Sequence, residues 1–149
     1  MKYFLLSLIG LLALLLIISL PSKSTVPQQE QPPLQLTYLA DDFSVYLTPN
    51  QTISSPLTIT GQARGSWFFE ATAPVVLVDW DGLIIAQGYI QTTEDWMTTE
   101  FVPFEGTLEF EIPSYKNNGA IIFHNDNPSG LPEHDRAVEI PIFYESSSF

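Results

Sequence analysis

Hydrophobic and polar residues alternate in short runs through most of the chain beyond residue 40, which is typical of half-buried β-strands. The runs are separated by Pro, Gly, Asn and Asp, the residues that favour turns. No convincing helix follows residue 20. The pattern predicts about seven strands, at residues 44–48, 57–63, 75–80, 83–86, 107–112, 120–124 and 138–144.

Short strands joined by tight turns predict an all-β fold, an immunoglobulin-like antiparallel β-sandwich. Asp81-Gly82 lies between two β-runs and predicts a hairpin with a type I′ turn, in which both central residues have positive φ. Residues 107–112 alternate cleanly, with apolar side chains expected inward and Glu109 and Glu111 outward.

Residues 55–70 combine a strand pattern with three consecutive aromatic residues. Gly61 interrupts the alternation, and Trp67, Phe68 and Phe69 follow the bend at residues 63–65. Because neighbouring side chains of a strand point to opposite faces, the three rings cannot all lie on one face. At least one of them is expected to cover a sheet edge, close one end of the sandwich or contact a partner.

The first twenty residues contain an almost unbroken apolar run from Tyr3 to Leu20, which Pro21 ends. As a helix this run would span about 27 Å, close to the hydrocarbon thickness of a bilayer. Its length favours an uncleaved anchor over a cleaved signal peptide, for which Ser22-Lys23-Ser24 is a poor cleavage site. Both alternatives place the rest of the chain outside the cytoplasm.

The sequence therefore predicts three parts: a transmembrane or signal helix at residues 1–20, a Pro- and Gln-rich linker at 21–40, and one domain at 41–149. The net charge is −12, and Lys2 and Lys23 flank the apolar run, so the exported part is more acidic still. Such a surface repels nucleic acid and anionic lipid headgroups. Without cysteine, the chain has no disulfide and no lipid attached to a cysteine.

The order of motifs along the domain resembles one known family. These motifs are Ser55-Pro56-Leu57, Gly61 with Ala63, residues 65–71 (Gly-Ser-Trp-Phe-Phe-Glu-Ala), Pro74 to Asp79 with Asp81-Gly82, Gly88, Asp95-Trp96-Met97-Thr98, Phe101, Pro103-Phe104, Thr107 to Phe110, residues 127–130 (Asn-Pro-Ser-Gly) and Ile140-Pro141-Ile142. Together they resemble Gmad2, the immunoglobulin-like domain of bacterial spore germination and sporulation proteins. The resemblance extends over residues 45–144.

The resemblance implies a bacterial, extracytoplasmic β-sandwich with a binding or scaffolding role and without assigned catalytic residues or a cofactor. The chain would then be a single-pass membrane protein, or a secreted one if the helix is cleaved, whose partner is an envelope protein or a cell-wall polymer. The resemblance also implies a role in germination or sporulation. A carbohydrate- or peptidoglycan-binding module that uses exposed aromatics is the alternative.

The candidate binding residues are aromatic residues with one neighbouring cation: Arg64, Trp67, Phe68, Phe69 and Trp96. Exposed rings stack on sugars or insert into protein partners, and Arg64 could add a cation–π contact or pair with Glu70. The competing interpretation is that these rings form part of the core and a lid over one end of the sandwich.

Metal and enzyme chemistry have weaker support. Asp79-Trp80-Asp81-Gly82 resembles the start of a calcium loop but lacks the later ligands. The loop residues His124, Asp126, His134 and Asp135 could bind a divalent ion if the loop folds back, although their spacing matches no ligand pattern. No Ser or Thr stands in a nucleophile motif with a histidine partner, so the chain is predicted not to be an enzyme.

Overall fold

The structure, a computed structural model, describes residues 37–145, and side chains from residue 41 onward. The predicted helix at 1–20 and most of the predicted linker at 21–40 lie outside the described residues. No helix within residues 37–145 has the length and apolar character needed to cross a membrane. The described part consists of nine strands and two short 3-10 helices: β1 (Thr37–Ala40), β2 (Phe43–Val45), β3 (Gln51–Ile53), β4 (Leu57–Arg64), η1 (Gly65–Trp67), β5 (Thr72–Asp79), β6 (Ile84–Gln91), β7 (Phe101–Leu108), β8 (Asn118–His124), η2 (Pro132–His134) and β9 (Ala137–Tyr144).

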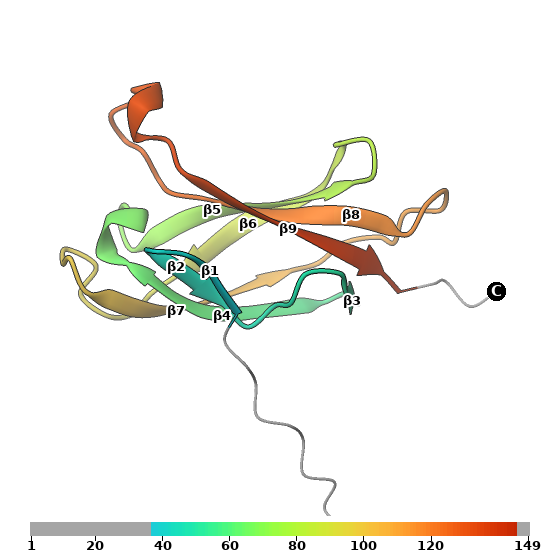
Figure 1. The fold of residues 1–149 in the computed structure, drawn as a ribbon, viewed down its shortest axis with the longest axis horizontal. Helices are drawn as coiled ribbons and strands as arrows, with labels where there is room; N and C mark the ends of the chain where they lie inside the picture. The colour runs from blue at the N-terminus through green and yellow to red at the C-terminus, as the bar shows by residue number, and fades with distance from the viewer. Residues whose placement is uncertain (1–36, 146–149) are drawn as a thin grey trace, which may run out of the picture. The chain divides into compact units, whose positions relative to one another are not determined.

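The nine strands form one sheet in the order β1-β2-β4-β7-β6-β5-β8-β9-β3. This sheet curls so that β5, β8 and β9 face β4 and β7 across the core (Figure 1). Where β6 meets β7, the pairing comprises only Ile90↔Gly106 and Gln91↔Glu105. The all-β prediction is confirmed, and the sandwich is a single curled sheet.

Two corrections concern strand number and direction. The predicted seven strands omit β1 and β3, which are too short to show alternation, and β1 lies within the segment predicted as linker. β3 runs parallel to β9, whereas the other pairs are antiparallel.

A further correction concerns the extent of one strand. Strand β7 ends at Leu108, so the alternation that continues to Ile112 describes a segment packed on the core without strand pairing.

The core is built from the inward-facing positions of the two layers. In β9 every second residue is buried, from Val138 to Tyr144. The ring of Phe43 in β2 lies at the centre of one aromatic cluster, with its centroid 4.5 Å from Trp67, 5.3 Å from Phe104 and 4.9 Å from Phe123. Because offset and tilted ring pairs add to the energy of burial, this cluster holds the two layers together at one end.

The β5–β6 hairpin forms as predicted, but its turn is of another type. Gly82 has φ +80°, whereas Asp81 is not among the residues with positive φ. The Asp79 carboxylate accepts the N–H groups of Asp81 and Leu83, each at 2.9 Å, and Gly82 N–H donates to the Asp79 carbonyl at 3.1 Å. This is a three-residue loop with a glycine at the left-handed position, rather than a type I′ turn.

The two consecutive positive φ values of a type I′ turn occur instead at Glu70 and Ala71, with φ 50° and 65°. Phe69 and Thr72 exchange two backbone hydrogen bonds of 3.1 Å across this turn. Neither residue is Gly, Asn or Asp, so the turn is held in a conformation that costs about 1 kcal/mol or more per residue. Phe69, the last of the three consecutive aromatic residues, therefore lies directly before a strained turn.

Candidate functional site

Two of the predicted binding residues belong to the core. Trp67 is 1 % exposed and Phe68 is buried as well. The 3-10 turn η1 breaks the alternation of a strand, which lets two neighbouring rings point inward. Neither ring can stack on a ligand without leaving the core. Trp67 and Phe68 are therefore not part of an exposed aromatic surface.

Phe69 and Trp96, by contrast, reach the surface together. Phe69 is 39 % exposed, Trp96 is half-buried, and their rings meet edge to face with centroids 6.0 Å apart. Met97, which is largely exposed, follows Trp96. We call Phe69, Trp96 and Met97 the aromatic surface.

Gly65 lets the segment that carries Trp96 lie directly against η1. A Cβ atom at residue 65 would be 2.2 Å from the Trp96 carbonyl oxygen and 2.3 Å from that of Thr98. Gly65 N–H also donates to the Glu100 carbonyl at 3.1 Å. Any larger residue at this position would displace the 96–100 segment, which carries Trp96.

Arg64 lies beside this segment rather than over a binding ring. Its guanidinium carbon is 4.4 Å from the centroid of the Phe101 ring, and Nη1 donates to the Thr99 carbonyl at 2.9 Å. The predicted cation–π contact therefore exists, and its partner is Phe101. Arg64 fixes the loop that presents Trp96.

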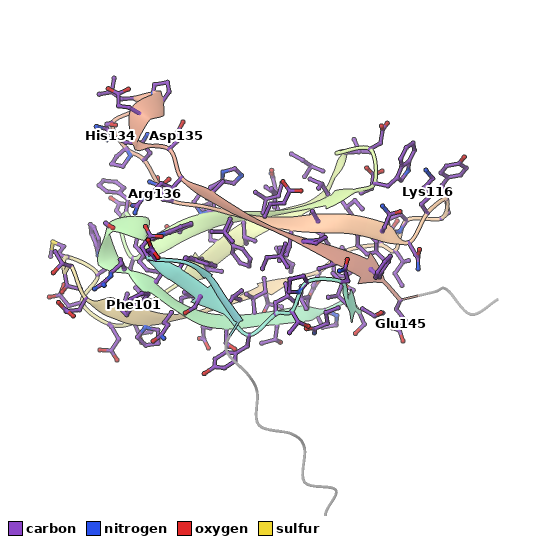
Figure 2. All side chains as sticks on the ribbon, viewed as in Figure 1. Phe101, Lys116, His134, Asp135, Arg136 and Glu145 are labelled. Atoms are coloured by element: carbon purple, nitrogen blue, oxygen red, sulfur yellow. The ribbon has the colours of Figure 1, made fainter. Side chains whose placement is uncertain are left out.

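A second arginine, Arg136, joins three segments at the same end of the domain (Figure 2). Its Nη1 forms a salt bridge with Asp42, and its Nη2 donates to the Ser66 carbonyl at 2.7 Å. The guanidinium also lies 5.5 Å from the centroid of the Trp67 ring. We call these contacts the Arg136 network; sequence patterns gave no signal for it, since the partners are 94 and 70 residues away.

The loop between β8 and β9 is organised by its own amide and hydroxyl groups. Asn127 Nδ2 donates to the Leu131 carbonyl at 2.9 Å and to Asp135 Oδ1 at 2.8 Å. Arg136 N–H donates to Asn125 Oδ1 at 2.6 Å. Asn127 Oδ1 also accepts the Ser129 N–H at 3.2 Å, which is an Asx turn, so side-chain hydrogen bonds within the loop account for its shape.

The structure does not gather His124, Asp126, His134 and Asp135 into a metal site. Within residues 37–145, no three or more His, Asp or Glu side chains converge as a metal would require. His124 and His134 are exposed. A pocket of about 430 Å³ between this loop and η1 is lined by Ser66, Asp126, His134 and Arg136, among others.

The opposite end of the domain carries an exposed aromatic pair that the candidate residues did not include. Trp80 is 41 % exposed, and its ring centroid lies 5.9 Å from that of the largely exposed Tyr115. Lys116 Nζ is 3.7 Å from the centroid of the Trp80 ring. Figure 2 shows Lys116 at the far end from Arg136. The one sequence feature that could have indicated this exposed pair is Trp80, a large aromatic residue in a hairpin loop.

Next to this pair, a groove of about 460 Å³ lies between the β5–β6 hairpin and the segment that follows β7. We call it the seam groove. It is lined by Asp79, Trp80, Leu83, Ile85, Glu111, Ile112, Pro113, Ser114 and Tyr115. Its walls therefore combine apolar and aromatic side chains with two carboxylates, those of Asp79 and Glu111.

Comparison with known proteins identifies one family. A family model described as the immunoglobulin-like domain of bacterial spore germination, Gmad2, matches residues 48–130, which is more than half of the chain. The matched range includes β3 to β8 and the aromatic surface. Searches of curated proteins and of solved structures returned no match.

Proposed function

Since this chain belongs to the Gmad2 family of immunoglobulin-like domains of bacterial spore germination, we propose that it is a non-catalytic envelope module that binds or scaffolds a partner during germination or sporulation. The apolar segment at residues 1–20 would tether it to the cell membrane with the domain outside, or direct its secretion if cleaved. The acidic charge of the domain argues against nucleic acid as the partner.

The observation that carries this proposal is the aromatic surface. Phe69 and Trp96 expose apolar area next to each other, and the exposed Met97 follows Trp96 in a segment that packs against Gly65 and Arg64. Exposed aromatic and methionine side chains on a rigid support are the usual anchors of protein interfaces. The strained turn at Glu70–Ala71, which holds Phe69, is the kind of local cost that functional sites retain.

The carboxylates near the aromatic surface have structural partners. Asp95 Oδ1 accepts the Met97 N–H at 3.0 Å, and Glu100 Oε1 accepts the Thr99 hydroxyl at 3.5 Å. Both carboxylates therefore help to shape the loop. This supports a binding role over catalysis for this end of the domain.

A photo-crosslinking residue in place of Met97 tests the proposal on intact cells that express the full chain. We expect a discrete adduct that Phe69→Ala abolishes and Phe143→Ala preserves, since Phe143, in β9, is 37 % exposed and offers a matched control. An adduct pattern that is insensitive to Phe69→Ala would contradict the proposal.

A cell-wall polymer is the second candidate partner, because the Phe69–Trp96 pair also has the ring geometry on which a sugar could stack. Retention of the full chain on purified cell wall, lost in Trp96→Ala and kept in Phe143→Ala, would favour a polymer. Cell wall that retains both variants, or that does not retain the wild-type chain, would reject a polymer as the partner.

A further inference from the structure

Strand β6 has an outer edge without a strand partner over most of its length. It pairs with β5 at every residue except Ile85, where the register shifts, but with β7 only at Ile90 and Gln91. No strand within residues 37–145 pairs with the outer edge of β6 from Ile84 to Tyr89. Among the described residues, the backbone groups that point outward along this edge therefore have no strand partner, and only the Leu108 side chain is known to lie against Gly88.

The segment that follows β7 covers the core beside β6 with side chains and not with backbone pairing. Phe110 and Ile112 are half-buried and pack against the core, as do Ile85 and Ala86 on the β6 side. Phe110 N–H donates to Ser55 Oγ at 2.9 Å, away from β6. The seam groove is the gap that this arrangement leaves.

The sequence along this edge lacks charge and proline, two of the features that usually prevent strand addition, although a bulge lies at Ile85. From Leu83 to Thr93 the chain has no charged residue and no proline, although the net charge is −12. Leu83 is 68 % exposed and Ile84 is 53 % exposed. Natural edge strands normally carry charges, prolines or covering loops, so an uncharged open edge indicates a docking surface.

The charges around the seam groove indicate the chemistry of its occupant. Asp79 and Glu111 line the groove, and Asp81 and Glu109 are exposed nearby, against one cation, Lys116. A second copy of this acidic chain, paired β6 to β6, would bring two such rims together. A partner strand with basic residues is attracted instead.

We propose that the seam groove accepts an extended peptide segment of a partner protein, with apolar residues at alternate positions and basic residues between them, as an added strand along β6. The backbone of the segment would pair with residues 84–89. Its apolar side chains would contact Leu83, Ile85 and Ile112, and its basic residues would face the acidic rim. This surface lies at the far end from the aromatic surface and does not depend on it.

A nonapeptide of alternating valine and lysine is a suitable probe for the full-length chain, with the same peptide N-methylated at every backbone amide as the control. Both peptides carry the same charge, but the methylated one loses backbone donors. We expect saturable binding of the first peptide, slower amide hydrogen exchange at residues 84–89 in its presence, and neither effect with the second. Equal binding of the two peptides would overturn strand addition, as would protection elsewhere.

The variant Ile84→Lys places on the edge the residue that natural edge strands use against pairing. We expect it to raise the dissociation constant for the nonapeptide by about tenfold or more, because lysine repels the basic probe and removes an apolar contact. Leu131→Lys, an equal charge change in the distant β8–β9 loop, should change it by less than about twofold.

Leu83→Lys serves as a second edge variant should Ile84→Lys lower the melting temperature, and the same tenfold loss is expected. Unchanged affinity in a folded edge variant would overturn the proposal. So would sedimentation of the wild-type chain as a dimer with residues 84–89 already protected, or protection of these residues by purified cell wall and not by the peptide.

Discussion

At one end of the domain, Arg136 ties the β1–β2 turn, η1 and the β8–β9 loop together, over an aromatic cluster whose tryptophan is buried. At the other end, Trp80 lies on the surface beside Tyr115, and the two layers of the sheet separate without completing their backbone pairing. Both ends contain a tryptophan and a cation. Burial of the ring and backbone pairing around it, rather than residue type, therefore decide whether a tryptophan stabilises the fold or is available to a ligand.

The two tryptophans give the largest expected difference. We expect Trp67→Ala to lower the free energy of unfolding by about 3–5 kcal/mol, because a fully buried ring and its contacts are lost. Trp80→Ala should cost about 1 kcal/mol or less, because much of the ring is exposed already. Urea unfolding of the two variants measures both values, and equal losses would break the contrast between the ends.

The next effect concerns Tyr144, near the end that carries Trp80. Its hydroxyl donates to the Val78 carbonyl at 2.8 Å inside the core, and Gly119 makes room for its ring. Tyr144→Phe removes this buried hydrogen bond and should cost about 1 kcal/mol at neutral pH. Tyr46→Phe, at an exposed ring, should cost less than about 0.5 kcal/mol. A loss of the same size in both variants would show that the buried bond contributes nothing.

The same residue predicts a pH dependence. Burial raises the pKa of the Tyr144 phenol above its ordinary value of 10.0, and the Asp79 carboxylate raises the pKa further. Above pH 10 the unfolded chain therefore loses this proton while the folded chain keeps it, so stability falls as pH rises, by up to about 1.4 kcal/mol per pH unit. Tyr144→Phe should remove this part of the slope, and an unchanged slope in unfolding at pH 9–11 would contradict the assignment.

The smallest expected effect is a gain in stability at the Arg136 end. Ala71 has φ 65°, a conformation that glycine adopts without strain. Ala71→Gly should stabilise the domain by about 0.5 kcal/mol, whereas Ala137→Gly, at an exposed extended residue, should destabilise it by a similar amount. Thermal unfolding resolves the two signs, and destabilisation by both would mean that the turn at residues 70–71 is not strained.

Strong alternation was enough to predict the central strands. The sequence predicted strands at residues 75–80 and 138–144, and the structure has β5 and β9 there, each with one buried face. The alternation of Leu108, Phe110 and Ile112 was a less reliable guide, since a loop that packs on the core shows the same pattern as a strand. β1 and β3, with four and three residues, showed no periodicity that could be detected.

The candidate surfaces were harder to predict, for physical reasons. Three consecutive aromatics indicated that one ring must leave the core, and the structure shows that this ring is Phe69. That Trp67 turns inward depends on η1, which has no sequence signal, and on Arg136 far along the chain. The type I′ turn at Glu70–Ala71 lacks the residues that normally mark one, so only the backbone reveals it.

The most direct test of the difference between the two ends is amide hydrogen exchange of the full-length chain, without any partner, compared between β5 and β6. Strand β5 has neighbours on both sides, whereas β6 has one neighbour over residues 84–89. We expect alternate amides of residues 84–89 to exchange much faster than any amide of residues 75–78. Equally slow exchange along both strands would show that the β6 edge is closed and would contradict this expectation.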